Sequence, residues 1–106
     1  MILSIKMNKV LITGAHGQDG IILSKILLKK RAIACSNIFP IESLYHWKGK
    51  LVHEKEHVMI LKTKNNKFDD VKKIIKKNHS YTIPCICSWK EEANEEYENW
   101  LNREVK

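Results

Sequence analysis

Apolar residues follow two different periods along this chain, and the changes between them divide it into strands and helices. Three stretches repeat their apolar positions at helical spacing and predict helices, at 21–31, 68–77 and 93–102. The other apolar stretches are rich in β-favouring residues and predict strands, at 7–13, in the two arms of 31–63 and at 81–89. The resulting order is strand, helix, strand, strand, helix, strand, helix. It predicts an α+β, ferredoxin-like βαββαβ sandwich with a C-terminal helix, as a single domain over 1–106.

The stretch 31–63 predicts a long central hairpin that turns at Lys48-Gly49-Lys50, where glycine tolerates a positive φ. Each arm has at least about ten residues, whereas an ordinary strand has about five or six. Two helices would cover one face of the antiparallel sheet and leave the other face bare. We therefore expect the outer half of the hairpin to pack against another copy of the same chain.

Composition and charge narrow the class of protein only slightly. The chain has 106 residues, of which 43% are hydrophobic and 29% charged, as in ordinary globular domains. The formal charge is +7, and the basic pairs that stand out lie in one predicted helix, at Lys72-Lys73 and Lys76-Lys77. They suit either phosphate or nucleic-acid binding, or the solvated face of a helix. Because no DNA- or RNA-binding motif accompanies them, we expect no nucleic-acid partner.

The cysteine content and the length of the apolar runs indicate the cellular compartment. Three cysteines cannot all pair within one chain. No apolar run has the length of a signal-peptide core or of a membrane span. We expect a cytoplasmic protein with reduced thiols and no membrane partner.

A glycine-rich stretch at 14–20 resembles the dinucleotide fingerprint that opens sugar-nucleotide dehydratases and epimerases. A predicted strand precedes it and a predicted helix follows, as pyrophosphate binding requires. However, a hairpin follows where a Rossmann unit needs another strand–helix crossover. Tyr45, Tyr81 and Tyr97 also lack a lysine four residues later. We expect a glycine turn without nucleotide binding and, since no catalytic set emerges, a protein that is not an enzyme.

The rest of the chain resembles the CutA family of divalent-cation tolerance proteins. The matching segments span nearly the whole sequence, at Thr13, 29–31, 34–50, Glu56, 60–63, 79–84, Tyr97 and 100–101. The resemblance implies a compact cytoplasmic homotrimer built through the long hairpins, similar to the PII signalling proteins. Four features depart from the family pattern: the glycine usual after Pro40 is missing, His46 replaces a tryptophan, Ser80 a proline and Cys85 a glutamate.

Metal binding rests on four candidate residues. Cys85 and Cys87 stand two apart on a predicted strand, so their thiols share one side, and thiolates suit Cu(I) and Zn²⁺. Cys35 or His79 is a candidate third ligand. The alternative is that the cysteines pack as small apolar residues and that His79 satisfies a loop carbonyl. Together with the resemblance to the CutA family, these candidate ligands predict a protein that binds or responds to divalent metal ions, copper foremost.

The hairpin carries a second candidate set. In the family's pattern a cleft between subunits is lined or braced by Glu42, Tyr45, Trp47, Lys50, Glu56 and Lys62, with Tyr81 nearby. Aromatic rings could stack a ligand there and Lys62 could neutralise an anion, although the same residue types also suit a protein interface. The alternative function is therefore a PII-like sensor that binds a small anionic effector between subunits.

Overall fold

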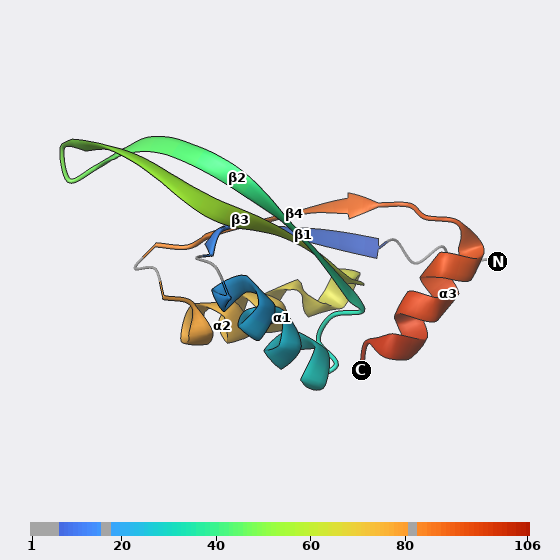
Figure 1. The fold of residues 1–106 in the computed structure, drawn as a ribbon. Helices are drawn as coiled ribbons and strands as arrows, with labels where there is room; N and C mark the ends of the chain where they lie inside the picture. The colour runs from blue at the N-terminus through green and yellow to red at the C-terminus, as the bar shows by residue number, and fades with distance from the viewer. Residues whose placement is uncertain (1–6, 16–17, 81–82) are drawn as a thin grey trace.

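The computed structural model describes residues 7–15, 18–80 and 83–106, which form four strands and three α-helices. The elements are β1 (Met7–Ala15), α1 (Asp19–Lys29), β2 (Cys35–Trp47), β3 (Lys50–Lys64), α2 (Phe68–Asn78), β4 (Cys85–Glu91) and α3 (Glu95–Glu104). The strands form an antiparallel sheet in the order β2-β3-β1-β4. Helices α1 and α2 lie against one face, and α3 lies at the end of the sheet where β2 begins (Figure 1). The predicted ferredoxin-like α+β fold is confirmed.

Several predicted boundaries were wrong, including those of the closing helix, predicted at 93–102 and observed at Glu95–Glu104. The stretch 14–20 is not a loop throughout, because β1 continues past a bulge to Ala15, which pairs with His57, and α1 already begins at Asp19. The last strand begins at Cys85 instead of residue 81; residues 81–82 lie outside the described ranges. Pro84 directly precedes this edge strand, and since proline has no N–H to donate, it suits a strand start.

The hairpin turn is tighter than predicted. Trp47 pairs with Lys50, so only Lys48 and Gly49 lie in the turn. Both have positive φ, at 50° and 77°, as a two-residue turn between twisted strands requires. The strands of 13 and 15 residues extend well beyond the helices (Figure 1), and the molecule measures 55 × 23 × 21 Å.

The two helices on the sheet are short and amphipathic. Leu23 and Leu27 of α1, and Val71 and Ile75 of α2, stand four residues apart and are buried, which places each pair on the side that meets the sheet. Across the described part of the chain, no helix is long and apolar enough to cross a membrane.

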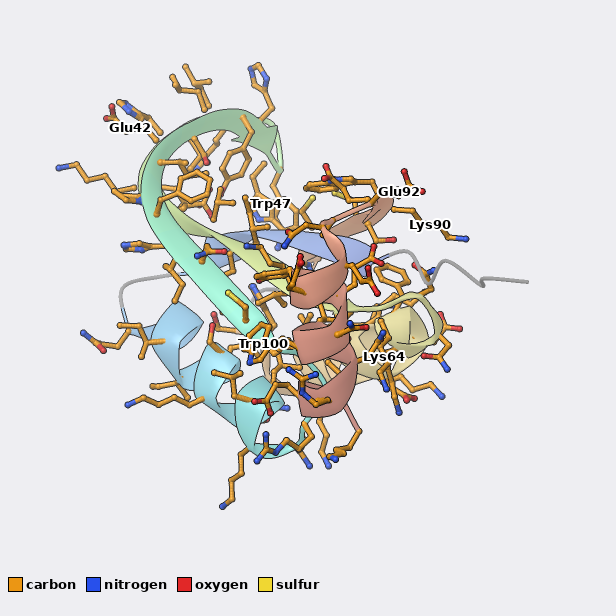
Figure 2. The ribbon with its side chains drawn as sticks, turned by 90° about the vertical axis from the view of Figure 1, so that its right-hand side faces the viewer. Glu42, Trp47, Lys64, Lys90, Glu92 and Trp100 are labelled. Carbon is orange, nitrogen blue, oxygen red and sulfur yellow. The ribbon has the colours of Figure 1, made fainter. Side chains whose placement is uncertain are left out.

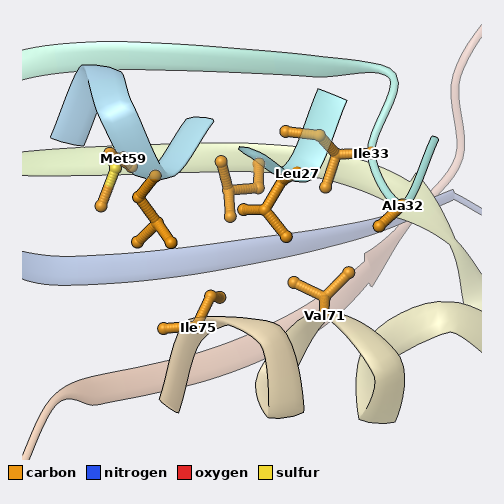
Figure 3. Packing of buried hydrophobic residues seen from close by; sticks show 8 residues of the cluster. Leu27, Ala32, Ile33, Met59, Val71 and Ile75 are labelled. Atoms are coloured by element: carbon orange, nitrogen blue, oxygen red, sulfur yellow. The ribbon is translucent and has the colours of Figure 1, made fainter. Parts of the chain in front are cut away.

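The main core lies between these helices and the inner halves of the central strands. Leu27, Met59, Leu61, Val71 and Ile75 are fully buried in it (Figure 3). A second, smaller cluster joins Leu101 and Val105 of the α3 region to Ala34. The core therefore ends where the helices end, and the outer half of the hairpin has none.

Candidate functional site

The hairpin has one face toward the helices and one face away from them. Ser36 of β2 and Met59 of β3 both contact Ser24 of α1, so side chains in phase with them face the helices. Residues one step out of phase face the opposite way, because side chains alternate along a strand. We call this opposite surface the open face. Along β2 the open face carries Phe39, Ile41, Tyr45 and Trp47. On β3, Val58 pairs with Phe39 and Val52 pairs with Tyr45.

The open face exposes large apolar side chains along β2. Phe39 and Trp47 retain 42% and 41% of their surface, although large aromatic side chains are usually well buried. The strands at both sides of the sheet, β2 and β4, are edge strands. An apolar face flanked by open edges is typical of a surface that associates with another chain.

Most of the predicted cleft residues share the open face, but they do not gather in one place. Tyr45, Trp47, Lys50, Glu56 and Lys62 lie on it by register. Lys50 and Lys62 are about 40 Å apart along β3, at roughly 3.3 Å per residue, so one chain forms no common cleft. The remaining two positions differ: Glu42 faces the other side, and Tyr81 lies outside the described residues. Figure 2 shows Glu42 and Trp47 on the hairpin and Trp100 on α3.

Two of these residues have specific partners near the tip of the hairpin. The Tyr45 hydroxyl donates to the carboxylate of Glu54, and this hydrogen bond raises the pKa of Tyr45 to about 12. On the other side, His53 Nε2 lies 3.2 Å from Glu42 Oε1. Glu54 was not among the predicted residues. The position of the turn would have identified it, because a turn at Lys48-Gly49 pairs Tyr45 with Val52. Glu54 is two residues further along β3 on the same face, diagonally opposite Tyr45.

Near the base of the hairpin, the open face meets α3. The Lys62 ammonium lies 5.4 Å from the centre of the Tyr97 ring, a cation–π contact. Midway along the hairpin, where it pairs with Ile41, Glu56 is also buried, with 5% of its surface exposed. The base of the open face is thus partly closed within the chain, whereas the tip is not.

The thiols of β4 are close neighbours. Cys87 pairs with Leu11, and Leu11 pairs with Ile60. Ile60 lies on the open face, because it is next to Met59, which faces the helices. Cys87, and Cys85 two residues before it, therefore project on the open face. Partial burial raises the pKa of the Cys87 thiol, and the neighbouring Cys85 raises it further. All three cysteines are free. The two thiols therefore form an accessible pair.

The other two predicted metal ligands lie elsewhere in the chain. Cys35 is on the opposite edge strand, three strand spacings or about 14 Å from β4, and its thiol donates to Asn37 Oδ1 at 3.6 Å. His79 follows α2 and borders a small pocket of about 90 Å³ with Asp19 and Ser80, which no cysteine lines. Among the described residues, no three His, Cys, Asp or Glu side chains are placed to hold one metal ion. The predicted ligands are thus not assembled within a single copy.

Comparison with known proteins agrees with this architecture. The family described as CutA1 divalent ion tolerance protein matches residues 9–104. The divalent-cation tolerance protein CutA of Archaeoglobus fulgidus is 39% identical over 99 residues, covering 92% of this chain and 97% of the relative. The corresponding protein of Thermotoga maritima is 42% identical over 84 residues, covering 78% and 83%. A solved CutA1 structure from Ehrlichia chaffeensis superposes with a TM-score of 0.91 at 29% identity, covering 98% of this chain and 99% of that one.

The fold and the open face define a ferredoxin-like domain whose hairpin extends past its own core. With the family match over nearly its whole length, the chain belongs to the CutA1 divalent ion tolerance protein family. The relatives are named for divalent-cation tolerance and not for a reaction. The resemblance of the glycine stretch to dehydratases does not extend to the fold, because the sheet is antiparallel throughout.

Proposed function

We propose that this protein is a homotrimer that contributes to divalent-cation tolerance by binding a metal ion, copper foremost, at the contacts between subunits. The observation that carries the proposal is the open face of the hairpin. It exposes Phe39 and Trp47 on the same side of the sheet as the thiols of Cys85 and Cys87. Burial of the apolar surface and assembly of the metal ligands would therefore occur in one step.

The sheet edges support self-association. Edge strands β2 and β4 both present unpaired backbone groups, so β2 of one copy and β4 of the next suit each other. Such a contact is heterologous and closes into a ring when the rotation between copies allows it. Three copies is the number that the resemblance to the CutA family implies.

The same arrangement explains how separated ligands could meet. Cys35 lies on β2 and Cys85 and Cys87 on β4, all on the open face by register. They are on opposite edges within one chain, but the neighbouring copy's β2 would bring a second Cys35 toward the thiol pair. Two or three thiolates suit Cu(I), which is a soft ion.

Two measurements test these points separately. Light scattering after size exclusion is expected to give three times the chain mass of 12.4 kDa. In a Cu(I) competition titration, Cys85→Ser/Cys87→Ser is expected to weaken binding by at least about tenfold, or 1.4 kcal/mol. Ser88→Ala, on the same strand, serves as the control and keeps the affinity of the unaltered chain. Unchanged Cu(I) affinity in the double variant would reject the thiol pair, and a monomeric mass would reject the subunit contact.

A second candidate function is a PII-like sensor of a small anionic effector. Its support is that Trp47, Lys50 and Lys62 share the open face, so aromatic and cationic groups from different copies could line one cleft. A panel of nucleotides titrated against the trimer distinguishes the two functions. Saturable binding that Trp47→Ala abolishes and Cys85→Ser/Cys87→Ser leaves intact favours the sensor.

We also infer a cytoplasmic setting, because reduced thiols are required for the proposed ligands and all three cysteines are free. A solved relative from Archaeoglobus fulgidus is described as periplasmic. Cell fractionation with detection of the native protein decides between the compartments.

A further inference from the structure

A second, basic pocket lies on the helix side of the molecule, away from the open face. It has a volume of about 290 Å³, close to the lower end of the range for small-molecule sites. Its lining combines three segments that are distant in sequence. Lys30 follows α1, Lys67 directly precedes α2, Lys73 lies in the middle of α2, and Lys106 follows α3. Four lysines therefore converge on one concavity.

The lining of this pocket has more lysines than acidic side chains. Asp70 is the acidic residue of its lining, and it pairs with Lys67 at 3.7 Å. Within the described ranges, Lys30, Lys73 and Lys106 have no ion-pair partner. Like charges held around one cavity repel each other, so a bound anion relieves that repulsion.

Two parts of the pocket lining are held in place by hydrogen bonds. Ala32 lines the pocket; its N–H donates to Leu27 O at 3.0 Å, and its carbonyl accepts from Thr63 Oγ1 at 2.6 Å. The Lys106 N–H donates to Arg31 O at 2.9 Å, which fixes the segment after α3 beside the end of α1. Much of the shape is therefore formed before any ligand binds, which lowers the entropic cost of binding.

We propose that this pocket binds a small molecule that carries two or more linked phosphate groups. Lysine is a compact point charge that pairs with phosphate through charge-assisted hydrogen bonds of about 2.8 Å. These lysines come from three separate segments of the pocket lining, so linked phosphates offer acceptor oxygens to more of them than a single phosphate does. The site is separate from the subunit contacts proposed above and does not depend on them.

Isothermal titration of the full chain with tripolyphosphate, at about 0.1 M salt to screen long-range attraction, tests the proposal. We expect one saturable site per chain and binding of orthophosphate that is at least about tenfold weaker. Lys30→Gln/Lys73→Gln should raise the Kd for tripolyphosphate by at least about tenfold, since it removes two charge-assisted contacts. Asp70→Asn should lower the Kd, because it removes the opposing charge.

The matched control is Lys25→Gln/Lys76→Gln. These lysines are exposed on the same two helices and outside the pocket, so the variant loses the same net charge. We expect its Kd to change by less than about twofold, because neither lysine lines the pocket and the control therefore removes no direct contact with the bound anion. Equal weakening in both double variants would show attraction by net charge alone and overturn the proposal. Absence of saturable binding to the unaltered chain would overturn it as well.

Discussion

The two halves of the central hairpin are made of the same two strands but have opposite environments. In the inner half, Met59 and Leu61 are fully buried beneath α1 and α2. In the outer half, Leu44 and Leu51 keep 65% and 67% of their surface exposed, and Trp47 keeps 41%. The inner half is therefore stabilised within the chain, whereas burial of the outer half requires a second molecule.

This contrast explains why a chain of 106 residues carries strands of 13 and 15 residues. Two helices of 11 residues span only about 16 Å, at 1.5 Å per residue, whereas β3 extends about 50 Å. The helices cannot cover the whole hairpin, so its outer half contributes little to the chain's own core.

The largest expected effect comes from the inner half. Leu61→Ala removes a fully buried side chain between sheet and helices and should lower the free energy of unfolding by about 3 kcal/mol. The loss should be the same at every protein concentration, as measured by urea denaturation. Leu44→Ala is the matched change in the outer half, and at concentrations where the chain is monomeric it should cost less than about 0.5 kcal/mol. Equal losses at low concentration would contradict the division of the hairpin.

The next effect concerns association through the outer half. Trp47→Glu places a charge on the open face and should cost about 2 kcal/mol or more at each subunit contact, as for an aromatic hot spot. Light scattering should then report single chains with unchanged circular dichroism. Leu28→Glu is the control, because Leu28 has the same 41% exposure but lies on α1. A trimer that persists in Trp47→Glu would place the contact elsewhere.

Much of the fold could be predicted from the sequence, because the type of each element follows from the local spacing of apolar residues. The apolar periods gave the order of elements, and the overlong hairpin arms indicated an uncovered surface. The boundaries at Ala15 and Cys85 were missed because strand ends depend on pairing with β3 and β1, which periodicity does not report.

The placement of the candidate ligands could not be predicted in the same way. Spacing correctly put Cys85 beside Cys87, but the distance to Cys35 depends on the strand order, which a one-dimensional pattern does not contain. The basic pocket was missed for the same reason. Lys30, Lys73 and Lys106 are far apart in sequence, and the predicted basic pairs of α2 contribute only Lys73 to it.

The smallest expected effect is a titration at the tip of the hairpin. The neutral Tyr45 phenol donates to the Glu54 carboxylate, which raises the pKa of Tyr45 from its ordinary 10.0 to about 12. Because the folded pKa is the higher one, the stabilisation is fully present below pH 10 and is lost as the pH rises from 10 to about 12. Ultraviolet absorbance of tyrosinate should show one late-titrating tyrosine of the three in the chain. Glu54→Gln should return that step toward pH 10, and Tyr45→Phe should remove it. A late step that survives in Tyr45→Phe would assign it to another tyrosine and leave the tip of the hairpin without this contact.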